Sequence, residues 1–416
     1  MITRPASLAE VDLTDVDVFW KGDPHAAWKI LRSEDPVHWQ KRSWGPGIWH
    51  ITKYDDVIRI SVDPENFISS NGIIMDNDGR AAQRDEQLQN ATGYADPRGQ
   101  MMIMTDPPRH TLMRQLVNKG FTHKAVRKLE DYCRGIVGKA LDEGADGCDF
   151  VLDVARNLPL DVICELVGVP EGDWEAMFEL SNRVIGFDDP EFARDEITAE
   201  QMQMSMDLFN YVLQLCQERR DNPRDDVLTQ LVNAEIDGQR LADHEIFLFF
   251  LLLIVAGNET TRNATSGGLL ALIEHPDQWA RLRDDPSLVP TAVDEILRWT
   301  SPVTHFTRTC TSDTEIRGRQ IRAGQDVCVW YPSANRDEDV FSNADSFDVG
   351  RSPNDHIAFG KGEHFCLGAN LARLELRVTF EEIVKRFEGA ELTAAPERLR
   401  SNFIAGIKRM PVRFLG

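Results

Sequence analysis

Helical periodicity dominates the pattern of apolar and polar positions. Between about residues 107 and 300 apolar residues recur at the spacing of amphipathic helices, as in KAVRKLEDYCRGIVGKAL (124–141) and MDLFNYVLQLCQERR (206–220). The stretch RTCTSDTEIRGRQIRAGQDVCVWYPSANR (308–336) instead alternates apolar and polar residues between Gly and Asp turns, which predicts short strands. IWHITKYDDVIRIS (48–61) predicts a strand followed by a helix, and a helical pattern resumes after residue 366.

The predicted fold class is therefore mainly α with small β-sheets. The chain has 416 residues, and its hydrophobic share of 42% and charged share of 27% are typical of a globular protein. No repeat, low-complexity segment or Gly/Ser-rich linker interrupts it, so we expect a single domain over residues 1–416.

Charge and hydropathy narrow the expected partners. The formal net charge of −22 argues against nucleic acid or an anionic membrane surface. The most apolar run, IFLFFLLLIVA (246–256), is shorter than the roughly 20 residues that span a bilayer, so we expect no membrane span. The first residues lack the pattern of a signal peptide, and the expected location is the cytoplasm.

The seven cysteines are scattered without a CxxC pair, which indicates reduced thiols. Cys366 stands out, because HIAFGKGEHFCLGANLARLEL (356–376) places it between a glycine-rich loop and a helical run. A cysteine at a helix start has its thiolate favoured by unpaired N–H groups, which suits a metal ligand. A buried structural cysteine, a zinc site with His364 and a nucleophile with a histidine base remain alternatives at this point.

Three further stretches carry polar residues in unusual places. DEILRWTSP (294–302) puts Glu295 and Arg298 on one helix face, as many solvated helices do. LLLIVAGNETTRNA (251–264) introduces polar residues into a very apolar helix, which indicates either a functional site or a helix boundary capped by Asn258. TDPPRHTLMRQLVNKGF (105–121) carries His110 and Arg114 four residues apart at a helix start.

In this order and at these separations, the four stretches resemble the cytochrome P450 haem-thiolate monooxygenases in their soluble bacterial form. FGKGEHFCLG (359–368) matches the haem-binding signature of that family at four positions, and the resemblance covers almost the whole chain. The matching residues are Phe359, Gly362, Cys366 and Gly368.

The resemblance implies a cytochrome P450 fold and a haem b cofactor, with no flavin or nicotinamide site in this chain. Cys366 would be the axial ligand of the haem iron. Arginine and histidine side chains would hold the haem carboxylates, although surface charge is the alternative for Arg308. The implied carboxylate ligands are His110, Arg114, Arg308 and His364. The residues implied to pack around the ring are Phe359, Gly360, Gly362, Gly368, Ala256 and Gly257.

Catalytic and structural roles follow from the same resemblance. Thr260 and Glu259 would pass protons to dioxygen at a local break in the helix. Glu295 and Arg298 would pair with Arg351 and stabilise the loop before Cys366. Apolar segments would line the substrate pocket, with plain core packing as the alternative for each. The candidate substrate-binding residues are Ile73, Ile74, Leu252, Val303, Phe306 and Phe403, with Met75 and Ile404 beside them.

The implied reaction is insertion of one oxygen atom of O2 into a C–H bond of a hydrophobic substrate. Electrons would come from a ferredoxin and its reductase, docking on the cysteine side at a basic patch of Lys361, Arg109, Arg114 and Lys119. AGNETTRN (256–263) and FIAGIKRMPVRF (403–414) are similar to the bacterial branch acting on sterols, branched lipids and terpenoids. A haem-thiolate peroxygenase or isomerase, or a non-catalytic haem sensor, are the rival classes.

Overall fold

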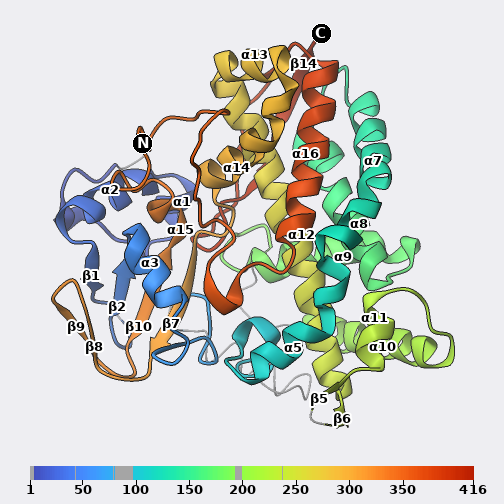
Figure 1. The fold of residues 1–416 in the computed structure, drawn as a ribbon, viewed down its shortest axis with the longest axis horizontal. Helices are drawn as coiled ribbons and strands as arrows, with labels where there is room; N and C mark the ends of the chain where they lie inside the picture. Colours follow the sequence, from blue (N-terminus) through green and yellow to red (C-terminus); the bar gives the residue numbers. More distant parts are fainter. Residues whose placement is uncertain (1–3, 43, 78, 80–96, 193–198, 237) are drawn as a thin grey trace.

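The computed structural model describes residues 4–42, 44–77, 79, 97–192, 199–236 and 238–416. Most helices lie on one side of the molecule, and the five-stranded sheet lies on the other together with a few short helices (Figure 1). This arrangement agrees with the mainly α class that the hydrophobic pattern predicts. The α-helices are α1 (Asp17–Trp20), α2 (Pro24–Glu34), α3 (Tyr54–Ser61), α5 (Arg109–Val117), α6 (His123–Val126), α7 (Glu130–Glu143), α8 (Asn157–Val167), α9 (Trp174–Ile185), α10 (Ala199–Asp221), α11 (Val227–Val232), α12 (Asp243–Glu274), α13 (Pro276–Asp284), α14 (Val289–Thr300), α15 (Tyr331–Ala334) and α16 (Ala369–Arg386).

The largest sheet has five strands in the order β1-β2-β10-β7-β3, and β10 runs parallel to β2 but antiparallel to β7. The predicted strand and helix at 48–61 are β2 and α3, and the alternating stretch at 308–336 contains β8, β9, β10 and the second half of β7. The strands are β1 (Val37–Gln40), β2 (Ile48–Ile51), β3 (Phe67–Ile68), β4 (Cys148–Asp149), β5 (Glu235–Ile236), β6 (Gln239–Arg240), β7 (His305–Cys310), β8 (Thr314–Ile316), β9 (Arg319–Ile321), β10 (Asp326–Trp330), β11 (Gly389–Leu392), β12 (Glu397–Arg398), β13 (Ile407–Arg409) and β14 (Pro411–Leu415).

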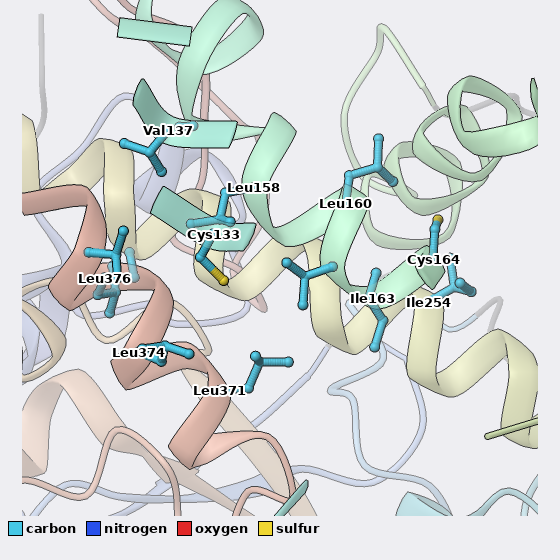
Figure 2. Packing of buried hydrophobic residues seen from close by; sticks show 14 of the residues in the cluster. Cys133, Val137, Leu158, Leu160, Ile163, Cys164, Ile254, Leu371, Leu374 and Leu376 are labelled. Atoms are coloured by element: carbon cyan, nitrogen blue, oxygen red, sulfur yellow. The ribbon is translucent and has the colours of Figure 1, made fainter. Parts of the chain in front are cut away.

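The helix α12 passes through the middle of the helical side and contacts α8, α9, α14 and α16 (Figure 1). Among the described residues it is the one helix long and apolar enough, by composition, to cross a membrane. Its apolar residues are instead buried in the largest core cluster, which also holds residues of α7, α8 and α16. Figure 2 shows part of this packing, with Cys133, Leu158, Ile163, Ile254 and Leu371 converging from four helices.

Candidate functional site

Cys366 lies in the turn that leads into α16, and its side chain faces a cavity between this turn and α12. Its backbone N–H donates to the Phe359 carbonyl at 2.9 Å, which closes the loop on itself. Gly360 and Gly362 both have φ of +71°, a region that favours glycine. The loop therefore presents its sulfur on a tightly folded backbone.

By the resemblance, Gly362 and Gly257 would leave room for the haem. In the structure each is required instead where two parts of the chain pack closely. A Cβ on Gly362 would collide with the Ser61 carbonyl at the end of α3, so this glycine seats the cysteine loop on α3. A Cβ on Gly257 would lie 2.6 Å from Cγ1 of Ile163, so this glycine lets α12 approach α8. Gly368 differs, because a Cβ there would meet nothing within 4 Å, and the residue lines the cavity.

Burial raises the pKa of the Cys366 thiol above its ordinary value. The Gly368 backbone N–H and the cations Arg114 and Arg373 act in the opposite direction. None of the other six cysteines lines the cavity. A metal ion that displaced the thiol proton would gain an anionic ligand already flanked by a backbone donor and two cations.

Three of the four predicted basic residues, His110, Arg114 and His364, line one end of the cavity. Arg308 is not among the lining residues, but it is near enough to lower the pKa of both histidines. The rings of His110 and His364 lie 4.1 Å apart, and the Arg114 Nη1 donates to the Glu363 carbonyl at 3.3 Å. Arg308 is buried, and its Nη1 donates to the Thr307 carbonyl at 2.7 Å, so the surface-charge alternative for Arg308 is wrong.

These basic groups have no carboxylate partner of their own at contact distance. His110 Nδ1 is buried without a hydrogen bond, and its nearest acid among the described residues, Glu363, lies 4.0 Å away. Burial, together with the charges of Arg308 and Arg114, lowers the pKa of His110 to about 4 and that of His364 to about 2. Neutral imidazoles and uncompensated guanidiniums at a buried cavity end fit the carboxylates of a porphyrin.

Thr260 lies on the opposite wall of the cavity, on α12. Its Oγ1 donates to the Ala256 carbonyl at 2.9 Å, within an α-helix that runs from Asp243 to Glu274 without interruption. The expected local break is therefore absent from this helix, and Asn258 caps no boundary. Ala256 and Gly257 also line the cavity, as the resemblance implies.

Glu259 is not among the residues that line the cavity, which corrects its expected position beside Thr260. It is buried and its carboxylate forms an ion pair with Arg262, whose Nη1 donates to Asn182 Oδ1 at 3.0 Å. Burial raises the pKa of Glu259, and Arg262 acts against that rise. The pair would have to separate before Glu259 could exchange a proton with the cavity.

Glu375 is an acidic residue of the cavity that the sequence reasoning missed. It lies on α16, lines the cavity, and has an Oε1 without a hydrogen-bond partner. Burial raises its pKa to about 8, and a hydrogen bond with Thr261 opposes the shift. The sequence carries a signal for it, because Glu375 stands between Leu374 and Leu376, both core residues.

Half of the predicted substrate residues line the cavity. Leu252, Val303 and Phe306 do so, together with Met102, Ile103 and Leu253, which the sequence reasoning missed. Ile73, Ile74 and Phe403 do not, and neither do Met75 and Ile404. These residues pack behind the wall: the Phe403 ring lies 5.8 Å from that of Phe306, and Ile73 accepts a backbone hydrogen bond from Thr307 at 2.8 Å.

The predicted structural triad is present and buried. Arg298 donates to both oxygens of Glu295, at 2.7 and 2.8 Å, and the Arg351 Nε donates to Glu295 Oε2 at 3.1 Å. The same two arginines donate to backbone carbonyls of residues 335–346. The triad thereby fixes the chain that leads to the cysteine loop against α14.

An apolar cavity closed by a cysteine thiol on one wall, a threonine-bearing helix on the other and a basic end is the arrangement that an iron porphyrin with a thiolate ligand requires. The family model described as Cytochrome P450 matches residues 182–411. The methyl-branched lipid omega-hydroxylase of Mycobacterium tuberculosis is 41% identical, over 97% of this chain and 95% of its own length. The steroid C26-monooxygenase of the same organism is 39% identical, over 97% and 93%.

A solved structure agrees with these relatives. The Mycobacterium marinum cytochrome P450 in complex with pseudoionone superimposes with a TM-score of 0.87 at 37% identity, covering 99% of this chain and all of its own. The chain belongs to the cytochrome P450 family, has the P450 fold and is a P450 monooxygenase with a haem-thiolate cofactor. This membership agrees with the resemblance that the cysteine signature carries.

Proposed function

We propose that this enzyme hydroxylates a small to medium hydrophobic molecule, of the steroid, terpenoid or branched-lipid class, using O2 and two electrons from a ferredoxin and its reductase. The cofactor is haem b, and the chain carries no flavin or nicotinamide site of its own. The enzyme acts in the cytoplasm. The observation that carries the proposal is the cavity itself, with Cys366 and Thr260 on facing walls and apolar residues around the remainder.

The walls of the cavity support an apolar substrate. Leu252, Leu253, Val303 and Phe306 line it away from the basic end, and Glu375 is the one carboxylic acid among the lining residues. Burial of hydrocarbon against an apolar wall is favourable by about 25 cal/mol per Å². Such a wall offers no hydrogen-bond or ion-pair partner to a charged group. Two relatives with the same cysteine-centred family fold carry lipid and steroid names, which favours this class over aromatic acids or polar natural products.

The haem, when bound, supplies the activation of O2 and the oxidation of the C–H bond. Cys366 would hold the haem iron through its sulfur, and His110, Arg114, Arg308 and His364 would bind the haem carboxylates. Thr260 would offer its hydroxyl proton from the wall of the same cavity. Glu375, whose pKa is raised to about 8 by burial, carries a proton at neutral pH and lines the same cavity.

The route from bulk water to Thr260 requires a change at Glu259. Its ion pair with Arg262 holds the carboxylate away from the cavity. Separation of the pair would free Glu259 to carry protons, so this residue acts as a gate in the proposed mechanism rather than as a fixed relay. Asn182, which accepts from Arg262 at 3.0 Å, links that gate to α9.

The proposal is tested by titrating the purified holoenzyme with a matched pair of ligands and recording the spin state of the haem. A steroid with a branched eight-carbon side chain should shift the haem to high spin and, with ferredoxin, reductase and NADH, give a hydroxylated product. The same steroid nucleus without the side chain is the control, because it keeps the ring system and removes the branched hydrocarbon. Absence of any shift with steroids, terpenoids and branched lipids alike would contradict the substrate class.

The same assay separates the rival functions. A peroxygenase or isomerase would form product with peroxide alone, or with no oxidant, and would form none with ferredoxin, reductase and NADH. A haem sensor would show no substrate-dependent NADH consumption. Either result would reverse the choice of a ferredoxin-dependent monooxygenase.

A further inference from the structure

A second cavity, of about 380 Å³, lies apart from the haem cavity and shares no lining residue with it. Its walls come from α2, the C-terminal half of α12, the end of α14, and the chain from Arg398 to Ile407. These elements meet on the side of the molecule where α2 packs near α15 (Figure 1). Since a water molecule takes up roughly 30 Å³ of liquid volume, the cavity has room for a ligand of several heavy atoms.

Three buried nitrogen atoms in this wall have no hydrogen-bond partner. They are Nε1 of Trp28, Nδ1 of His25 and Nε of Arg336. An indole N–H and a guanidinium can only donate, and a neutral imidazole nitrogen donates in one of its tautomers. Among the described residues that line this cavity, no fully buried side-chain oxygen lacks a hydrogen-bond partner, so the unpartnered buried groups are all nitrogens.

Arg336 is the strongest of the three groups. It is 9% exposed, stacks on the Trp299 ring at 3.8 Å, and makes no side-chain hydrogen bond or ion pair with any described residue. Five other buried arginines, Arg32, Arg219, Arg262, Arg298 and Arg351, each pair with a carboxylate, whereas Arg308 beside the haem cavity has no such pair among the described residues. Burial, together with Arg298, lowers the pKa of Arg336 to about 9, although Asp345 and Asp23 act in the opposite direction from beyond contact distance. A buried cation without a carboxylate in contact is costly, and an anion in the cavity would reduce that cost.

The surroundings select the kind of anion. Asp23 and Glu274 also line the cavity, and Asp23 is already engaged as the N-cap of α2, accepting from the Ala26 N–H at 3.1 Å. Arg336 and Arg398 bring two positive charges to the wall and Asp23 and Glu274 bring two negative ones, so the wall has no excess positive charge for a doubly charged phosphate. Apolar side chains cover much of the remaining wall, namely Phe19, Leu270, Leu399 and Ile404. A ligand with one negative charge and a hydrocarbon body matches both features.

We propose that this cavity binds a small organic monocarboxylate, whose carboxylate meets the guanidinium edge of Arg336 and the Trp28 indole N–H while its apolar body lies against α12. The planar fork of arginine matches a carboxylate through two parallel hydrogen bonds. His25, whose ring lies 5.1 Å from that of Trp28, closes the same side of the site. The site is separate from the proposed substrate cavity, and it stands whatever the substrate of the haem proves to be.

The site is tested with 4-bromobenzoate, in crystals of the haem-loaded enzyme whose haem cavity is blocked by an azole. The anomalous signal of bromine should locate one molecule between α2 and α12, with its carboxylate at Arg336. Bromine found only elsewhere, or ordered water alone in the cavity, would overturn the proposal. The alcohol 4-bromobenzyl alcohol is the matched probe without charge, and equal occupancy by it would also overturn the assignment.

Calorimetric titration of the same azole-bound enzyme tests the residues. Trp28→Phe keeps an aromatic ring and loses only the N–H, so we expect about fivefold weaker binding of 4-bromobenzoate, as one net hydrogen bond of about 1 kcal/mol implies. Arg336→Lys keeps the charge and loses the fork, and we expect about tenfold or greater weakening. Arg127→Gln, an exposed arginine outside the cavity, should bind as the wild type does.

If Arg336→Lys fails to fold, the affinity of Trp28→Phe for 4-bromobenzoate tests the proposed site by itself. Unchanged binding in Trp28→Phe and in any folded Arg336→Lys protein would place the carboxylate elsewhere. Inorganic phosphate serves as the competing oxyanion: failure to displace 4-bromobenzoate is expected, and displacement at equal concentration would overturn the monocarboxylate class.

Discussion

Glu259 and Glu375 are both buried glutamates near the centre of the molecule, and a nearby cation distinguishes them. Glu259 has Arg262 at its carboxylate, whereas Glu375 has only the Thr261 hydroxyl. Burial without a counter-ion favours the protonated acid, so Glu375 holds a proton to about pH 8. The acid that lines the cavity and carries a proton at neutral pH is therefore Glu375 on α16. The sequence pattern pointed instead to Glu259 on α12.

Replacing Glu375 by Gln should change how stability depends on pH. The folded-state pKa of about 8 lies above the ordinary value of 4.5, so the wild type loses stability as pH rises from about 4.5 to about 8. The slope for one proton is roughly 1.4 kcal/mol per pH unit, and it ends above pH 8. Glu375→Gln lacks this loss, and denaturant unfolding at a series of pH values measures the difference.

Glu382→Gln is the matched control on the same helix. Glu382 pairs with Arg134 and Arg386, which more than offset the effect of its partial burial and keep the pKa below the ordinary value, so its contribution is lost only on acidification. Its stability profile should run parallel to the wild type between pH 6 and 9. If Glu375→Gln also runs parallel there, Glu375 is ionised in the folded protein.

Removal of the Thr260 hydroxyl should separate NADH consumption from hydroxylation. In Thr260→Ala we expect substrate-dependent NADH oxidation to continue while product falls and hydrogen peroxide rises, because the Thr260 proton is lost and the neighbouring Thr261 hydroxyl is bonded to Glu375. Positioned proton donors contribute roughly 10²–10⁴-fold, so coupling should fall at least about tenfold. Thr260→Ser keeps the hydroxyl and should restore much of the coupling, whereas full coupling in the alanine variant would remove Thr260 from the mechanism.

At the scale of elements, the hydrophobic pattern locates α12, α16 and the central strands β2 and β10 of the main sheet, because the 3.6-residue and two-residue periods differ plainly there. The edge strands β1 and β3 are not predicted. The break expected in α12 is wrong for a local reason. Thr260, Asn263 and Thr265 each donate a side-chain hydrogen bond to the carbonyl four residues earlier, so the polar groups are satisfied within the helix.

The candidate site, too, could be predicted from the sequence only in part. The cysteine loop and the basic residues are found because they form short motifs, whereas the wall residues depend on which face of a buried element meets the cavity. Ile73 and Phe403 are as apolar as Leu252 and Phe306, and nothing in the sequence says that they pack one layer behind. Glu375 is not predicted from the sequence, because the stretch 356–376 indicates a role only for Cys366 and the residues of its loop.

The approach of α12 to α8 depends on Gly257. Gly257→Ala should destabilise the protein by roughly 1–3 kcal/mol, since its Cβ would lie 2.6 Å from Ile163 Cγ1 in a packed core. The double variant with Ile163→Val should recover part of the loss, which a double-mutant cycle of denaturant unfolding measures. Gly135→Ala in α7, where a Cβ meets nothing within 4 Å, should instead stabilise the protein by about 0.5–1 kcal/mol.

The change in stability of Gly257→Ala distinguishes two explanations of this glycine, helix packing and room for the haem. A neutral Gly257→Ala variant, with no coupling to Ile163, would mean that the two helices are free to separate at this point. The glycine would then be explained by haem clearance, as the family resemblance implies.

At the scale of the whole molecule, the net charge of −22 means that docking of the proposed ferredoxin, if it is acidic too, would be favoured by a local basic surface. The expected patch of Lys361, Arg109, Arg114 and Lys119 is smaller than the sequence indicates. Arg109 pairs with Glu245, and Arg114 lines the haem cavity. Lys361 and Lys119 remain exposed beside the cysteine loop and α5, so they are the groups that can meet a ferredoxin there.

Charge reversal at Lys361 tests the docking face without touching the haem ligands. In Lys361→Glu we expect reduction by ferredoxin to slow several-fold at low ionic strength, since a rim charge acts mainly on the rate of association. The difference from the wild type should shrink as salt shortens the Debye length to about 8 Å near 0.15 M. Stopped-flow formation of the reduced carbonyl adduct measures the rate, and Lys41→Glu, an exposed lysine after β1, should leave it unchanged. Equal slowing in both variants would assign the effect to the net charge of −22 and would place the donor on another face.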